Sequence, residues 1–162
     1  MFSREQTKLI QKLARQCLEK GISLVTAESC TGGLLSSLLT QEAGSSKWFD
    51  RGFVTYSNNS KIDSLGVREE TLGNFGAVSQ EVANEMSTGA LKNSEANLGI
   101  SITGIAGPDG GSLTKPVGTV YFSIANQKKV ILEHKSDFKG SREAIRKESV
   151  LFVLNKLLNL TL

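Results

Sequence analysis

The sequence of 162 residues is poor in the side chains that build metal centres and disulfide frameworks, with one histidine and two cysteines. Cys17 and Cys30 have neither the spacing of zinc ligands nor the pattern of a disulfide-bonded domain. A structural zinc site is therefore not expected. A Ser-His-Asp triad is not expected either, because His134 falls in a predicted hairpin strand, where we expect an exposed side chain.

Long apolar runs and a concentrated positive charge are also missing. No stretch is long enough to span a membrane, and residues 1–6 lack the apolar core of a signal peptide. The net charge is only +3, and the lysines and arginines are scattered along the chain. We therefore expect neither a membrane nor a nucleic acid as partner, and the cytoplasm as location, while a small anionic ligand remains compatible.

The residues that are present have the composition of one globular domain, which we expect to cover residues 1–162 because no linker or repeat interrupts them. Apolar side chains recur at helical spacing in some segments and in short β-branched runs in others. Helices are expected over 3–20, 34–41, 61–65, 68–72, from 79 and from 140, and strands over 22–25, 49–56, 97–103, 117–125 and 129–137. This order predicts an α/β fold, a three-layer α/β/α sandwich with a mixed, largely parallel sheet.

The segment 26–33 (TAESCTGG) lies between the first predicted strand and the helix that follows it. Ser29 is therefore expected on the turn, with Gly32 and Gly33 allowing a ligand to approach the backbone closely. Unpaired N–H groups at a helix N-terminus suit an exposed nucleophile beside an oxyanion hole, or a phosphate site. The alternative is that Ser29 or Thr31 only caps the helix.

A serine nucleophile needs a base, and without a usable histidine the best candidate is Lys61. Lys61 comes shortly after Tyr56 and the second predicted strand, and burial could lower the pKa of its amine enough for it to accept a proton. Ser29, Tyr56 and Thr103 all follow strands, so they are expected to converge at one edge of the sheet. Alternatively, Lys61 is a solvated surface charge. We expect Cys30 to be a small buried residue rather than the nucleophile.

The segment 104–111 holds four glycines in eight residues, although it matches neither a Walker A loop nor Gly-x-Gly-x-x-Gly. It is either a long turn before the hairpin or a loop that approaches a ligand through its backbone. Arg142, at the start of the last helix, could pair with a phosphate or be one of several exposed helix charges.

Seven blocks, in order, resemble the CinA C-terminal domain family. They are TAESCTGG from Thr26, GFVTYSNNSK ending at Lys61, LGV from Leu65, GAVS from Gly76, TGIAGPDGG from Thr103, KPVGTV from Lys115, and G-x-R-x-x-I-R from Gly140 to Arg146. The resemblance spans nearly the whole chain, and the ordered set is far more specific than any one block.

The resemblance implies a nicotinamide mononucleotide deamidase of pyridine nucleotide salvage, which yields nicotinate mononucleotide and ammonia. The family's catalytic serine, tyrosine and lysine fall on Ser29, Tyr56 and Lys61. Ser29 would attack the amide carbon, Lys61 would take its proton directly or through Tyr56, and nearby amides would stabilise the oxyanion.

Substrate binding, by the same resemblance, is expected at the two glycine segments and at the start of the last helix, where the 5′-phosphate needs donors. The residues are Thr31, Gly32, Gly33, Thr103, Gly104, Gly107 and Arg142. The resemblance implies no metal, no cofactor and a homo-oligomer. The alternatives are a non-catalytic nucleotide-binding module and a Ser-Lys amidase for another small amide.

Overall fold

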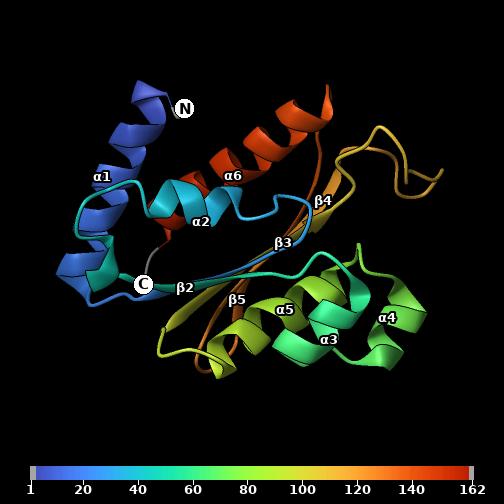
Figure 1. Ribbon diagram of the computed structural model, residues 1–162, viewed down its shortest axis with the longest axis horizontal. Coiled ribbons are helices and arrows are strands. Elements are labelled where there is room, and N and C mark those ends of the chain that lie inside the picture. The colour runs from blue at the N-terminus through green and yellow to red at the C-terminus, as the bar shows by residue number, and fades with distance from the viewer. Residues whose placement is uncertain (1–2, 161–162) are drawn as a thin grey trace.

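The computed structural model, which describes residues 3–160, has one mixed sheet between two layers of helices (Figure 1). In chain order its elements are α1 (Arg4–Lys20), β1 (Leu24–Glu28), α2 (Leu34–Leu39), the 3₁₀ turn η1 (Ser45–Lys47), β2 (Phe49–Val54), α3 (Asn58–Leu65), α4 (Glu69–Phe75), α5 (Gln80–Lys92), β3 (Leu98–Gly104), β4 (Thr119–Asn126), β5 (Val130–Asp137) and α6 (Arg142–Asn159). Helices α1, α2 and α6 cover one face and α3, α4 and α5 the other. The predicted three-layer α/β/α sandwich is confirmed.

The strand order in the sheet is β2-β1-β3-β4-β5. Strand β1 runs parallel to β2 and β3, whereas β4 is antiparallel to β3 and β5, so the predicted mixed sheet is confirmed. Because β2, β1 and β3 run in the same direction, their carboxyl ends meet at one edge of the sheet, where α/β proteins place their ligand sites. The pairing of Glu28 with both Val54 and Ile102 aligns these ends.

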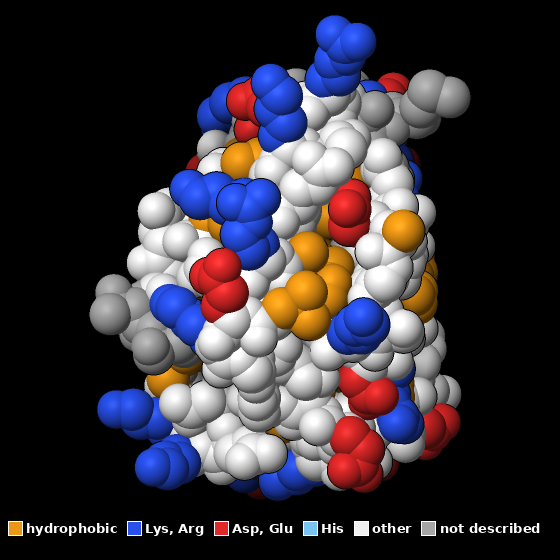
Figure 2. Space-filling model, turned by 90° about the vertical axis from the view of Figure 1, so that its left-hand side faces the viewer, with side chains coloured by type: hydrophobic (Ala, Val, Ile, Leu, Met, Phe, Trp, Pro, Cys, Tyr) orange, Lys and Arg blue, Asp and Glu red, His pale blue; other side chains and the backbone are white. Residues whose placement is uncertain are grey.

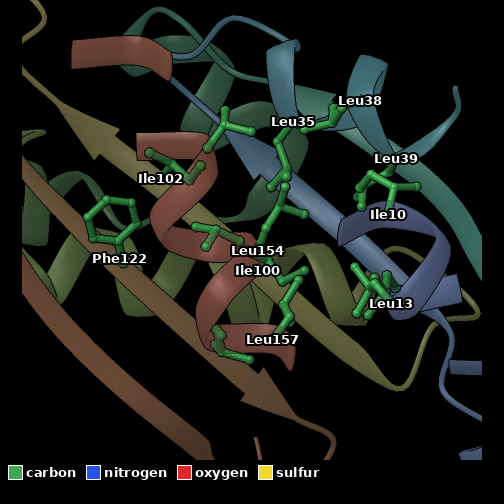
Figure 3. Packing of buried hydrophobic residues seen from close by; sticks show 14 of the residues in the cluster. Ile10, Leu13, Leu35, Leu38, Leu39, Ile100, Ile102, Phe122, Leu154 and Leu157 are labelled. Carbon is green, nitrogen blue, oxygen red and sulfur yellow. The ribbon is translucent and has the colours of Figure 1, made fainter. Parts of the chain in front are cut away.

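Two apolar cores hold the layers together. Between the sheet and α1, α2 and α6, side chains such as Leu38, Ile100 and Leu154 interdigitate (Figure 3). On the other face, Val25 and Ala27 pack against α5. Strand β1 is buried on both faces, which fits its position between β2 and β3.

Serine side chains cap four helices in the described part of the chain: α1, α3, α5 and α6. The capping box of Ser3 and the left-handed Gly21 bound α1, as the sequence predicts. The segment 57–60, expected only to end the second strand, forms a second capping box in which Ser57 and Ser60 bind each other's main chain. Helix α3 therefore begins earlier than predicted, and Lys61 lies inside it rather than at its start.

His134 is half-buried on β5, and the prediction of an exposed side chain is wrong. Its ring stacks on Phe152 of α6 at 4.5 Å between centroids and lies 6.4 Å from the ring of Phe122. Burial lowers the pKa of the imidazole. His134 is half-buried because the face of β5 that carries it packs against the C-terminal half of α6, where Phe152 joins it in an aromatic cluster.

The face shown in Figure 2 carries basic and acidic side chains side by side, around a small apolar patch. Such mixing fits the mild net charge and contrasts with the continuous basic stripe of a nucleic-acid-binding face. Within residues 3–160, no helix combines the length and the apolar character needed to cross a membrane.

Candidate active site

A cavity of about 270 Å³ lies where β1, β2 and β3 end. Seven of the ten predicted site residues line it: Ser29, Tyr56, Lys61, Thr103, Gly104, Gly107 and Arg142. A larger hollow of about 510 Å³, next to the start of α1 and the first half of α6, contains none of them. The predicted convergence of the strand ends is therefore what the fold produces.

Ser29 and Lys61 touch at the floor of this cavity. The Nζ atom of Lys61 lies 3.1 Å from the Oγ atom of Ser29 and donates to the carbonyl oxygen of Thr55 at 2.8 Å. Ser29 is 9% exposed and Lys61 only 1%. Thr55, which the sequence analysis missed, is itself held by a hydrogen bond from its N–H to the carbonyl of Glu28. The amine is therefore fixed between two strand ends.

Burial changes the protonation of Lys61. Desolvation lowers the pKa of its amine from 10.5 to about 8. In the described part of the chain, no ion pair involves Lys61, so no carboxylate offsets this effect. The alternative of a solvated surface lysine is wrong, and the neutral form of the amine is far more accessible near neutral pH than in an exposed lysine.

Cys30 follows Ser29 and also lines the cavity. It is buried, and desolvation raises the pKa of its thiol to about 12. Because the thiolate is the nucleophilic form, this cysteine is inert at physiological pH. The prediction of a small buried residue is confirmed.

The cap of α2 is the carboxylate of Glu28, which the sequence analysis missed. Its Oε2 accepts the N–H of Gly33 at 3.1 Å and of Leu35 at 3.0 Å, and its Oε1 accepts the N–H of Ser36 at 2.8 Å. The alternative that Ser29 or Thr31 caps this helix is wrong. The signal in the sequence is an acid at the end of a short strand that is buried along its whole length, eight residues before Ser36.

Thr31, Gly32 and Gly33 do not line the cavity. The N–H of Gly32 donates to the carbonyl of Ser29 at 3.0 Å, and the N–H of Gly33 is held by Glu28. Neither amide is free to bind an oxyanion, and the expectation of an open helix N-terminus is wrong. Instead, both glycines adopt positive φ, 58° and 92°, which lets the chain turn tightly from β1 into α2.

Arg142 joins two parts of the cavity wall. Its Nη2 donates to the phenol oxygen of Tyr56 at 2.7 Å, and its Nη1 donates to the carbonyl of Gly107 at 2.8 Å. Tyr56 is 60% exposed, so this pair lies toward the mouth of the cavity. A guanidinium has five N–H groups, so the remaining donors are available to an anion.

The glycine-rich segment forms the opposite wall. Thr103 is buried, and its hydroxyl donates to the carbonyl of Ala77 at 2.8 Å, so this proton is already in use. Gly107 has φ of 76°, and the loop beyond it brings Asp109 to the cavity. The segment is more than a long turn before the hairpin, because residues between Gly104 and Gly110 line the cavity.

Arg146 is a further residue that the sequence analysis missed. Its Nη2 donates to the carbonyl of Thr31 at 2.9 Å, one helical turn after Arg142. The i, i+4 spacing places both arginines on the same side of α6, where Arg142 lines the cavity and Arg146 holds the turn at Thr31 behind it.

The residues that line the cavity do not form a metal-binding site. Within residues 3–160, no three His, Cys, Asp or Glu side chains come together in a way that could hold a metal ion. The absence of a metal and of a cofactor stays a prediction that a chelator can test.

Comparison with known proteins extends over nearly the whole chain. A profile of the CinA C-terminal domain matches residues 6–161. Nicotinamide-nucleotide amidohydrolase PncC of Escherichia coli K12 is 46% identical over 157 residues, which cover 97% of this chain and 95% of that protein. The protein of the same name from Enterobacter agglomerans is 52% identical over 139 residues, covering 86% of this chain and 85% of its own.

A solved structure agrees with the fold. Competence/damage inducible protein CihA from Agrobacterium tumefaciens superposes with a TM-score of 0.94 at 44% identity, and the match covers 99% of each chain. The similarity therefore includes every element that lines the cavity.

Proposed function

The chain belongs to the CinA C-terminal domain family, and on that premise we propose that it hydrolyses the carboxamide of nicotinamide mononucleotide. The products are nicotinate mononucleotide and ammonia, which places the reaction in pyridine nucleotide salvage. Two relatives close in sequence carry the name nicotinamide-nucleotide amidohydrolase, and this chain is an amidohydrolase of the same class. The observation that carries the chemistry is the contact between Lys61 and Ser29.

Lys61 serves as the base in its neutral form. The amine then donates one N–H to the carbonyl of Thr55, and its lone pair accepts the hydrogen of the Ser29 hydroxyl. The low pKa of Lys61 supports this assignment, because a protonated amine has no lone pair to offer. The proton passes directly, since the Nζ atom of Lys61 lies within hydrogen-bond distance of the Ser29 Oγ atom.

The reaction proceeds in two halves. Ser29 Oγ attacks the carboxamide carbon while its proton moves to Lys61, and the carbonyl oxygen becomes an oxyanion. The C–N bond breaks as the ammonium of Lys61 returns the proton to the leaving nitrogen, so ammonia departs and an acyl ester remains on Ser29. Water then attacks this ester, with Lys61 again taking the proton and giving it back to Ser29.

The oxyanion is assigned to the N–H of Cys30, the residue that follows the nucleophile. Cys30 lines the cavity, and no main-chain acceptor for its N–H is present in the described part of the chain. The N–H groups of Gly32 and Gly33, which are already bonded, are not part of this hole.

The nucleotide is oriented by groups nearer the mouth. Arg142 uses its free N–H groups for the 5′-phosphate, together with the amides of the loop from Gly104, and Tyr56 presents its hydroxyl to the substrate. The buried Ser29 thus meets the carboxamide, and the phosphate stays at the exposed end.

Ammonia release from nicotinamide mononucleotide tests this proposal. Purified protein, with and without a chelator, should release ammonia and form nicotinate mononucleotide, and Ser29→Ala should reduce turnover to background. Calorimetric binding without ammonia release would replace the proposal by a non-catalytic binding module. Faster turnover of another small amide in a substrate panel would replace the substrate.

A further inference from the structure

Glu28 is a buried carboxylate without a cationic partner. It is fully buried, and none of the ion pairs within residues 3–160 includes it. A buried charge is costly unless hydrogen bonds satisfy it. Here four bonds do so, from the N–H groups of Gly33, Leu35 and Ser36 and from the Ser36 hydroxyl at 2.7 Å.

We propose that Glu28 is a positioning residue that holds the nucleophile turn, residues 29–33, so that Ser29 faces Lys61. The proposal rests on the proposed function, because it assigns Glu28 a role in the same reaction. Glu28 itself touches neither the cavity nor Lys61. It acts through the main chain on either side of Ser29.

The nucleophile turn is anchored at both ends. At its start, the carbonyl of Glu28 accepts the N–H of Thr55, and the N–H of Ser29 donates to the carbonyl of Ile102. At its end, the Glu28 side chain holds Gly33 and the first turn of α2. Glu28 is thus tied to β2 through its main chain and to α2 through its side chain, and the turn between has little freedom to move.

The two faces of β1 separate positioning from proton transfer. Glu28 points to the α2 face, where its acceptors are satisfied, while Ser29 meets Lys61 from α3 on the other face. A carboxylate next to Lys61 would favour the charged amine and raise its pKa. The arrangement holds the turn with a strong hydrogen-bond acceptor and places no carboxylate where it would stabilise the charged form of Lys61.

Two hydroxyl groups and a glycine hold the Glu28 carboxylate in place from the side away from the turn. Ser36 Oγ donates to Glu28 and lies 2.7 Å from the Oγ1 of Thr26. On the neighbouring strand, a Cβ at Gly52 would overlap the Ser36 hydroxyl. The absence of a side chain at residue 52 therefore leaves room for this buried network, which fixes the carboxylate from behind.

The test compares Glu28→Gln with Leu38→Ala. Glutamine has nearly the same shape as glutamate but only one acceptor oxygen. Its NH₂ group would face a main-chain N–H of the turn or of α2, and two donors cannot form a hydrogen bond. We expect kcat to fall about tenfold to a hundredfold, as for a misplaced nucleophile, with KM within about twofold. The limb of the pH profile assigned to Lys61 should not move. Leu38→Ala loosens the buried face of α2 but leaves all four bonds, and its kcat per folded molecule should match the wild type.

Amide hydrogen exchange tests whether Glu28 holds the nucleophile turn, and it requires no measurement of turnover. Glu28→Gln, and more so Glu28→Ala, should speed exchange of residues 30–36 selectively, whereas Leu38→Ala should not. The proposal is overturned if Glu28→Gln keeps its kcat, if Leu38→Ala loses as much, if the pH limb shifts, or if exchange over 30–36 is unchanged. Wild type that releases no ammonia would instead refute the proposed function, and exchange would still decide whether Glu28 holds the turn.

Discussion

Gly89 of α5 packs against the main chain of Leu65, the last residue of α3, so closely that a Cβ at residue 89 would overlap the Leu65 carbonyl oxygen. Helix α3 carries Lys61, and its position against α5 sets how far the amine reaches toward Ser29. A packing contact remote from the cavity therefore bears on the catalytic distance.

Replacing Gly89 with alanine should lower both stability and turnover. Alanine favours an isolated helix by about 1 kcal/mol, but here overpacking against backbone should cost about 1–3 kcal/mol and displace α3. Denaturant unfolding and ammonia release measure the two effects. Gly73→Ala in α4 is the matched control, since its Cβ would meet nothing within 4 Å and should leave both unchanged or raise stability. A Gly89→Ala protein as stable and active as the wild type would refute this account.

The pH profile should follow the neutral fraction of Lys61. Because burial lowers the pKa of the amine to about 8, the base is mostly protonated below that pH. We expect kcat/KM to fall about tenfold for each pH unit below the pKa. Values of kcat/KM measured between pH 6 and pH 9, in buffers of constant ionic strength, define this decrease on the acidic side of the profile. A flat profile from pH 8 to pH 6 would exclude a neutral lysine base.

Lys61→Met should abolish activity and raise stability. Near pH 7 the wild type must bury a partly desolvated cation or release its proton, whereas methionine has no charge. Between pH 8 and 10.5 the unfolded chain binds a proton that the native amine has lost, so wild-type stability rises with pH in that window. The variant should be more stable by about 3 kcal/mol at pH 7 and lack this rise. Chemical unfolding at several pH values is the measurement, and parallel curves would contradict it.

Arg142→Ala should impair recognition of the phosphate. Losing charge-assisted hydrogen bonds should raise KM for nicotinamide mononucleotide about tenfold to a hundredfold. KM for nicotinamide riboside, which lacks the phosphate, should change much less. Lys147→Ala on the same helix is the control, because Lys147 pairs only with exposed Glu143 at 2.6 Å. Equal losses on nucleotide and nucleoside would assign Arg142 to holding Tyr56 and Gly107 in place rather than to binding the phosphate.

Cys30→Ala should keep most of the activity. The protonated thiol contributes packing at the cavity wall, and its N–H survives the substitution, so kcat should stay within about fivefold. Iodoacetamide at pH 8 should leave the wild type active, because the pKa of this thiol is about 12. Rapid inactivation by the reagent, with Cys30 as the modified residue, would point to a different nucleophile.

Several features of the fold and of the site can be predicted from the sequence because they depend on local interactions. The capping box of Ser3 and the turn that carries Ser29 depend on a few neighbouring residues, and their spacing predicts them. The same local pattern offers Ser29 or Thr31 as the cap of α2, and neither side chain fills that role. A carboxylate five to eight residues upstream competes for the same N–H groups, and only the burial of Glu28 decides that competition.

By itself, the sequence determined the order of helices and strands and the three-layer architecture, because periodicity and turn residues act over short distances. Their places after strand ends made Ser29, Tyr56 and Lys61 candidates, and the family resemblance is what implied catalytic roles for them. The tertiary structure decided the surroundings of these side chains. It buried Lys61, which lowers the pKa of its amine, and it brought Arg142 to Tyr56 across 86 positions of the chain. Desolvation and long-range pairing arise only when the layers pack, so no local pattern can report them.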